Sequence, residues 1–145
     1  MRSSHETFFD HETFAVVGHG ARGNFPVLTY RGLKKRGKTV HAVDPSAAEV
    51  EGDRAYPDLG SLPATVEAAV LEVPKEDTAA WIQAVADAGI RHVWIHMGRD
   101  TLEALSVARE HGLEVCSGAC AVMYLTDGFS IHGIHKAIRK LAGRY

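Results

Sequence analysis

The sequence has few cysteines, little excess charge and no long apolar run, and each of these absences excludes a class of protein. Two cysteines in 145 residues cannot build a disulfide framework, which favours a reducing, cytoplasmic location. The formal net charge of -2 gives no reason to expect nucleic acid as a partner, because binding to a phosphate backbone needs a basic excess. No apolar run is long enough for a membrane span, and residues 1–6 lack the apolar centre of a signal peptide.

The motifs of several common enzyme classes are also missing. None of the nine histidines lies in an H-E-x-x-H pattern, and no serine or cysteine lies in a nucleophile elbow. Cys116 and Cys120, with His132 and His135, imitate a zinc-binding pattern, but the two histidines stand one residue too close for a zinc finger. We therefore expect no catalytic residue and no metal site, and the sequence identifies no protein partner.

What the sequence does contain is a regular alternation of short apolar strands and amphipathic helices. Three predicted helices end at a glycine (Gly37, Gly89 and Gly112), and a β-branched strand follows each of them. Strands are predicted near 14–17, 39–43, 68–73, 92–96 and 113–116, with a short extra strand near 55–56. Such alternation is typical of a doubly wound α/β fold, here a single Rossmann-type domain with a mostly parallel five- to six-stranded sheet.

The domain boundaries follow from the same pattern. Residues 1–12 are polar and are predicted to lie as an arm or short helix over a domain that spans residues 13–145. That domain is expected to close with an amphipathic helix over residues 131–141. Asn24 and Asp100 precede predicted helices and are expected to cap their N-termini.

The most informative functional feature is a glycine-rich loop between the first strand and the first helix. Gly18, Gly20 and Gly23 stand at G-x-G-x-x-G spacing directly after an apolar run. In a βαβ unit, such glycines let the backbone approach a diphosphate, and the helix that follows offers unpaired N–H groups. We therefore predict that this loop binds the diphosphate of a nucleotide cofactor, with contacts from Gly18, His19, Gly20, Ala21, Arg22, Gly23 and Asn24.

Two side chains of this loop can add to the backbone contacts. Arg22 is the only basic residue of the loop, and its guanidinium group suits a bidentate contact with a phosphate, although it also fits a solvated loop charge. The imidazole of His19 is the second candidate for a phosphate contact.

Three further loops are expected at the same edge of the sheet, because ligands of a doubly wound fold bind beyond the carboxyl ends of its strands. They contain Asp44-Pro45, Val73-Pro74 and Met97-Gly98. Asp44 follows the second strand, where an acidic side chain would bind the ribose hydroxyls of NAD. Pro45, directly after it, suits the adenine site of another cofactor equally well, so both interpretations remain open.

Five short segments stand in a characteristic order and spacing: Val16-Val17-Gly18, Val43-Asp44-Pro45, Tyr56-Pro57-Asp58-Leu59, Val73-Pro74 and Trp94-Ile95-His96-Met97-Gly98. Together they resemble the small stand-alone CoA-binding proteins, a family similar to the first domain of the succinyl-CoA synthetase α subunit. The resemblance covers about residues 14–123. It implies that the glycine loop holds the CoA diphosphate, that Asp44-Pro45 and Val73-Pro74 flank the adenosine part, and that Met97-Gly98 lies toward the pantetheine arm.

The chain departs from the usual pattern of that family at three places. Gly20 stands where the family loop commonly has serine, and Ser46 stands in a segment where a lysine often follows the second strand. Gly118 and Ala119 replace an Asp-Arg pair before Cys120, a position at which the family usually has cysteine. These differences concern the affinity for CoA more than the fold.

We therefore expect non-catalytic binding of CoA or an acyl-CoA. The alternatives are an NAD- or NADP-binding oxidoreductase or redox sensor, and an interaction module without a ligand.

Overall fold

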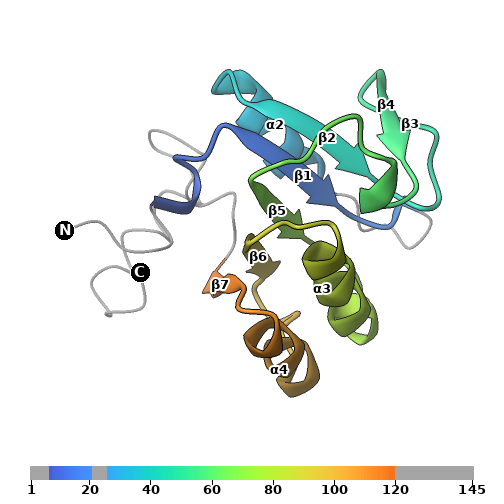
Figure 1. Ribbon diagram of the computed structural model, residues 1–145. Coiled ribbons are helices and arrows are strands. Elements are labelled where there is room, and N and C mark those ends of the chain that lie inside the picture. The colour runs from blue at the N-terminus through green and yellow to red at the C-terminus, as the bar shows by residue number, and fades with distance from the viewer. Residues whose placement is uncertain (1–6, 21–25, 120–145) are drawn as a thin grey trace.

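The computed structural model describes residues 7–20 and 26–119, which form a twisted sheet with helices on both faces (Figure 1). Seven strands of the described residues lie in the order β3-β4-β2-β1-β5-β6-β7. All neighbouring strands pair in parallel except β3 and β4, which are antiparallel. The strands are β1 (Thr13–Val17), β2 (Thr39–Val43), β3 (Glu49–Val50), β4 (Asp53–Tyr56), β5 (Ala68–Leu71), β6 (His92–His96) and β7 (Glu114–Ala119). This confirms the predicted α/β class.

Helices connect the parallel strands, as the alternating pattern predicted. They are α2 (Val27–Lys35), α3 (Thr78–Asp87) and α4 (Leu102–Glu110), with short 3-10 turns η2 (Leu59–Ser61) and η3 (Lys75–Asp77). Gly37, Gly89 and Gly112, just beyond the three helices, have φ angles of 78°, 77° and 67°. This left-handed conformation is the one in which glycine terminates a helix, so the three predicted helix ends are confirmed. No helix within the described ranges is long and apolar enough to span a membrane.

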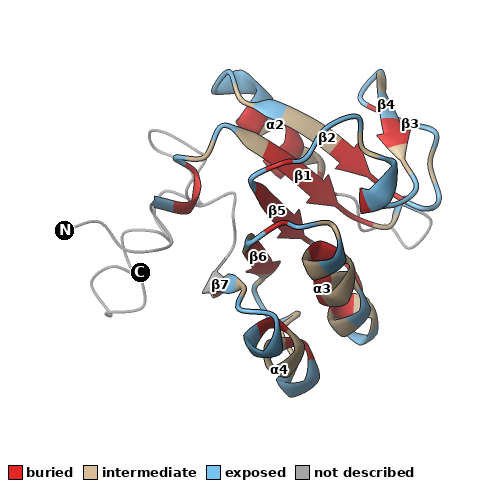
Figure 2. Cartoon of the chain, viewed as in Figure 1, coloured by how far each residue is buried: buried red, intermediate tan, exposed pale blue. Residues whose placement is uncertain are grey.

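The central strands are buried on both faces, as the red strands in Figure 2 show. Along β1, Phe14 and Val16 join Tyr30 of α2 in one core cluster. Ala15 and Val17 point to the opposite face and join Ile82 of α3 in a second cluster. Because successive side chains of a strand point to opposite faces, one five-residue strand supplies both cores.

The end of the predicted N-terminal arm belongs to the first of these cores. Phe8 and Phe9 are each 4% exposed. The ring of Phe9 lies 5.1 Å from that of Trp94, and the ring of Phe8 lies 5.9 Å from that of Phe14, measured between centroids. Residues 7–12 therefore contribute apolar packing beneath β1 and β6, beyond the covering role that their polar composition predicts.

Three details differ from the sequence-based expectation. The sheet has seven strands instead of five or six, because the two-residue β3 folds back on β4 through a turn at Glu51 and Gly52, whose φ angles are 53° and 81°. The N-cap of α4 is Thr101 instead of Asp100. Thr101 has extended backbone angles, and its Oγ1 accepts a hydrogen bond from the N–H of Ala104 at 3.0 Å. Asn24 and the predicted helix over 131–141 lie outside the described residues.

Candidate functional site

Parallel strand order brings the predicted loops to one edge of the sheet. β1 pairs with β2 on one side and with β5 on the other, so the order reverses at β1. Chains leave β1 and β5 in opposite directions at such a reversal, which opens a crevice at the carboxyl ends of the strands. The first loop starts at this point with Gly18, while Asp44, Val73 and Met97 follow β2, β5 and β6 at the same edge.

The side chain of Asp44 holds the start of the glycine loop at Gly20. Its Oδ2 accepts a hydrogen bond of 2.7 Å from the backbone N–H of Gly20. Its Oδ1 accepts hydrogen bonds from the backbone N–H of Ser46 at 2.8 Å and from the hydroxyl of Ser46 at 2.6 Å. Asp44 is 1% exposed, and these bonds compensate for the burial of its carboxylate. In this structure the carboxylate of Asp44 accepts hydrogen bonds from Gly20 and Ser46. The NAD interpretation requires the same carboxylate to face a ribose.

Asp44 occupies the space that a side chain at position 20 would need, so glycine suits this position. A Cβ atom at Gly20 would lie 2.8 Å from Asp44 Oδ2, closer than real Cβ contacts. Ser46, one of the departures from the family pattern, completes this arrangement through its hydrogen bonds to the same carboxylate. The two departures at Gly20 and Ser46 thus form one linked structural feature with Asp44.

Within the glycine loop, the structure describes residues 18–20. Gly18 is buried, and its N–H donates a hydrogen bond of 3.0 Å to the carbonyl of Val43. His19 is half-buried, and its Nδ1 is a buried atom without a hydrogen-bond partner among the described residues. The remaining predicted contacts lie outside the described residues: Ala21, Arg22, Gly23 and Asn24.

The other two predicted loops offer different chemical groups to the crevice. Val73 and Pro74 are buried, and the carbonyl of Val73 accepts a hydrogen bond of 3.2 Å from the guanidinium of Arg99. Met97 is 45% exposed, and Gly98 beside it has a φ angle of 80°. Pro45 is exposed as well. Of the residues predicted to contact the cofactor in these loops, Pro45 and Met97 thus present apolar side chains at the surface.

A polar cluster at the same edge was not identified from the sequence. Glu72 Oε2 accepts a hydrogen bond of 3.0 Å from the hydroxyl of Thr29, in the first turn of α2. Glu72 Oε1 lies 3.4 Å from Nδ1 of His96, within ion-pair distance but without forming a hydrogen bond. Glu72 was predicted as part of a strand over 68–73. A charged residue at the end of a buried strand, next to the reversal in strand order, was the signal that could have identified it.

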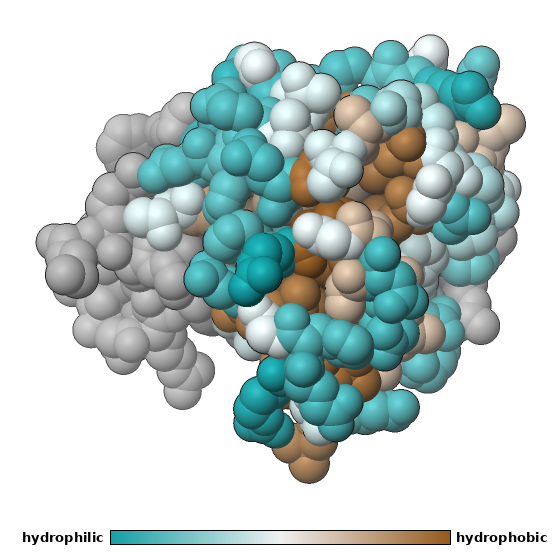
Figure 3. All heavy atoms as spheres, viewed as in Figure 1, coloured by the Kyte–Doolittle hydropathy of each residue, from teal (hydrophilic) through white to brown (hydrophobic). Residues whose placement is uncertain are grey.

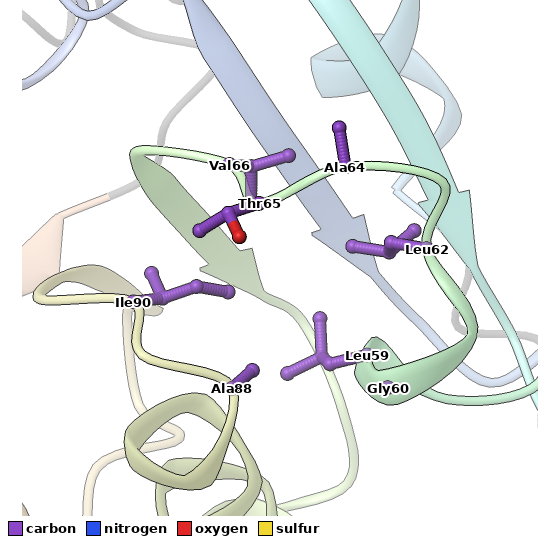
Figure 4. A pocket seen from close by; sticks show the side chains of 8 residues that line it. All are labelled: Leu59, Gly60, Leu62, Ala64, Thr65, Val66, Ala88 and Ile90. Carbon is purple, nitrogen blue, oxygen red and sulfur yellow. The ribbon is translucent and has the colours of Figure 1, made fainter.

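The described residues also form a separate cavity lined mostly by apolar side chains, away from the glycine loop. It has a volume of about 250 Å³ and lies between the η2 segment and the end of α3 (Figure 4). Its lining includes Leu59, Leu62, Val66, Ala88 and Ile90 and contains no charged side chain. Viewed as in Figure 1, the surface has apolar residues in its middle with hydrophilic ones around them (Figure 3). A cavity of this composition does not suit a diphosphate.

The zinc-like pattern of cysteines and histidines lies mostly outside the described residues. Cys116 is buried in β7, whereas Cys120, His132 and His135 lie outside the described residues. Within residues 7–20 and 26–119, there is no cluster of three or more His, Cys, Asp or Glu side chains that suits a metal ion.

The reversed strand order and the loop after β1 define a Rossmann-type domain. The model of the family described as CoA binding domain matches residues 12–126, so the chain belongs to this CoA-binding domain family. This confirms the family that the five sequence segments predicted. A search of curated proteins finds no match.

Solved structures show the same fold. A hypothetical protein from Pyrococcus horikoshii superimposes with a TM-score of 0.73 and 22% identity, covering 86% of this chain and 94% of that one. A conserved hypothetical protein from Pyrococcus furiosus has a TM-score of 0.68 and 24% identity, with 77% and 97% covered. A dinucleotide-forming acetyl-coenzyme A synthetase from Ca. Korarchaeum cryptofilum has a TM-score of 0.63 and 25% identity. The match covers 76% of this chain but only 26% of the synthetase.

Proposed function

We propose that this protein is a cytoplasmic binder of CoA or an acyl-CoA, which it holds without catalysis through the glycine loop after β1. The observation that supports this most directly is the close contact between the backbone of Gly20 and the carboxylate of Asp44. The start of the loop, held at Gly20 by a buried carboxylate, is preorganised, so little conformational freedom is lost there when a ligand binds to its backbone. Membership of the CoA-binding domain family indicates which ligand this is.

The residues at the edge of the sheet fit the parts of CoA. The N–H groups of the glycine loop and of the first turn of α2 suit the diphosphate, since a helix N-terminus attracts anions. The exposed Met97 and the turn at Gly98 suit the flexible pantetheine arm, because methionine adapts its shape to an irregular partner. Pro45 and the segment at Val73-Pro74 would flank the adenosine. These contacts bind and orient the ligand, and the proposal includes no bond-breaking step.

Isothermal titration calorimetry with CoA, NAD and NADP tests the proposal. We expect saturable binding of CoA and no binding of NAD or NADP, because Asp44 is already engaged by Gly20 and Ser46. Binding of NAD or NADP without binding of CoA would support the oxidoreductase or redox-sensor alternative instead. Absence of binding for all three would favour a module without a ligand.

Native mass spectrometry of gently purified protein complements this titration. A mass increment equal to CoA or an acyl-CoA would identify the ligand and its acyl group directly. An increment equal to NAD or NADP would contradict the proposal.

A further inference from the structure

We propose that Glu72 and His96 form a protonatable subsite of the crevice, which takes up a proton when a phosphate-bearing ligand binds. This inference rests on the proposed function, because it requires an anionic ligand at the glycine loop. It assigns a binding role to two residues that no motif of the glycine loop includes.

Glu72 lies at the centre of the strand reversal. Its backbone N–H donates a hydrogen bond of 2.9 Å to the carbonyl of Val17, the last residue of β1, so Glu72 stands beside the start of the glycine loop. Its carboxylate reaches the first turn of α2, where it accepts the hydrogen bond from Thr29. The side chain of Glu72 is only 19% exposed. A partly buried carboxylate thus occupies the region that a diphosphate approaches.

This arrangement opposes anion binding unless the charge of Glu72 is balanced. Like charges in a partly desolvated site repel each other, whereas an opposite charge at ion-pair distance offsets the repulsion. The Nδ1 atom of His96 is the group placed to supply that charge, since it lies 3.4 Å from Glu72 Oε1. Nδ1 itself is buried although 23% of the His96 side chain is exposed, so the exposed part of the ring faces away from Glu72.

Histidine is the side chain that normally changes charge between pH 5 and pH 8. Among the described residues, the carboxylate of Glu72 is the negative group placed at ion-pair distance from His96 before a ligand binds. A bound diphosphate adds further negative charge and favours the protonated ring. Binding and proton uptake at His96 should therefore occur together.

Other charged or titratable groups lie at this edge of the sheet, and their contacts differ. Asp44 is held by its three hydrogen bonds, and the guanidinium of Arg99 is held by the carbonyl of Val73. Lys75 is exposed beyond Pro74. His19, in the glycine loop, is the second group able to change charge in the same pH range, so the experiment must separate it from His96.

The test is calorimetric titration of the full chain with CoA at pH 7.5, in two buffers that differ in their enthalpy of ionisation. The difference in binding heat between the buffers gives the number of protons taken up. The 3′-phosphate of CoA itself titrates near pH 6, so each titration is repeated with dephospho-CoA, which lacks it. We expect uptake of a fraction of a proton with both ligands, and a several-fold loss of affinity between pH 6 and pH 8.

Two substitutions test the subsite. His96→Gln should remove the uptake and flatten the pH dependence. Glu72→Gln should tighten binding several-fold at pH 8, where the repulsion between its carboxylate and the ligand is largest. His92→Gln is the matched control. His92 stands at the other end of β6 and forms its own ion pair, 3.0 Å from Glu114, so its loss should leave the uptake unchanged.

The outcomes separate this inference from the proposed function. Equal binding heats in the two buffers, or uptake that persists in His96→Gln, would overturn the protonatable subsite and leave CoA binding intact. Persistence in His96→Gln combined with loss in His19→Gln would place the proton on the glycine loop instead. Absence of CoA binding in the unmodified protein at every pH would contradict both proposals.

Discussion

The backbone N–H of Gly20 lies 2.7 Å from Oδ2 of Asp44, a contact that connects the loops after β1 and β2 across 24 positions of the sequence. The two residues depend on each other. The carboxylate can approach closely because Gly20 has no Cβ atom, and the start of the loop is held because the buried carboxylate accepts the N–H of Gly20. The candidate site is therefore sensitive to substitutions that do not touch the ligand.

Gly20→Ala tests the close approach. The added Cβ would lie 2.8 Å from Asp44 Oδ2, so either the carboxylate or the start of the loop must shift and their hydrogen bond is disturbed. We expect a loss of about 1–3 kcal/mol in the free energy of unfolding, as for other overpacked sites, and at least a tenfold loss of CoA affinity. Urea denaturation and calorimetric titration measure these two effects.

Gly60→Ala is the control for this substitution. Its Cβ would lie 3.5 Å from Asp58 Oδ1, an ordinary van der Waals contact, so stability and affinity should change little. Equal effects of the two alanine substitutions would contradict the role given to Gly20.

Asp44→Asn separates two roles of the carboxylate. An asparagine offers one oxygen acceptor, and its NH2 group would face either the N–H of Gly20 or the donors of Ser46. We expect a loss of about 1–3 kcal/mol in stability and weaker CoA binding, because the buried side chain loses at least one of its hydrogen bonds and the start of the loop is released. If Asp44 acted only as a negative charge near the ligand, the same change would tighten CoA binding.

Asp58→Asn is the matched control for Asp44→Asn. Asp58 also accepts hydrogen bonds from the backbone N–H and hydroxyl of a serine, Ser61, at 2.8 and 2.7 Å, but it is exposed. Asp58→Asn should lower the free energy of unfolding by less than Asp44→Asn does, and it should leave CoA binding unchanged. An equal loss of affinity in both variants would mean that loop fixation by Asp44 is not what supports binding.

Most of the sheet could be predicted because its strands are short apolar runs and three of them follow a glycine that ends a helix. Gly37, Gly89 and Gly112 each mark a helix end by a backbone conformation that other residues rarely adopt. β3 could not be predicted, since a two-residue strand has no periodicity and depends on pairing with β4. The cap of α4 moved by one position because Asp100 and Thr101 are both good N-caps, and only the backbone geometry selects between them.

The candidate site was predicted in its location but not in its internal contacts. The order of strands and loops was enough to bring Gly18, Asp44, Val73 and Met97 to one edge. That Asp44 faces Gly20 instead of the crevice depends on rotamers and distances between residues far apart in the chain. The pairing of Glu72 with His96 likewise joins two neighbouring strands, and sequence spacing alone does not show such cross-strand contacts.

A further prediction concerns acid stability and the start of β1. Glu67 Oε1 accepts hydrogen bonds from the N–H of Glu12 at 2.8 Å and from that of Thr13 at 3.3 Å. The bond from Glu12 is the main cause that lowers the pKa of Glu67 below the ordinary glutamate value, and the charge of His11 contributes to the same effect. A carboxyl group with a lowered pKa in the folded state stabilises the protein above its unfolded pKa, and this contribution is lost as the pH falls.

Glu67→Gln should therefore make unfolding less dependent on pH in the acid range. The unmodified protein is expected to lose stability as the pH falls below the ordinary glutamate pKa of about 4.3, and the variant should lose less over the same range. Urea denaturation at a series of pH values measures the difference. Glu49→Gln, at an exposed position of β3, is the control and should follow the unmodified protein. Parallel curves for Glu67→Gln and the unmodified protein would contradict the role of these hydrogen bonds.

The last prediction concerns the packing of the N-terminal segment. The ring of Phe9 is 4% exposed and lies 5.1 Å from the ring of Trp94 and 6.1 Å from that of Phe14, between centroids. Phe9→Ala should lower the free energy of unfolding by about 3–5 kcal/mol, because it removes buried apolar surface and leaves a cavity. Leu102→Ala, at a position 88% exposed, is the control and should lower the free energy of unfolding by well under half as much.

The fluorescence of Trp94 gives a second measurement, made in a Trp81→Phe background. The emission should shift to the red when Phe9 is replaced, since water gains access to a ring that is fully buried in the unmodified protein. If Phe9→Ala instead matches the control in stability and leaves the emission unchanged, residues 7–12 cover the domain without supporting its core.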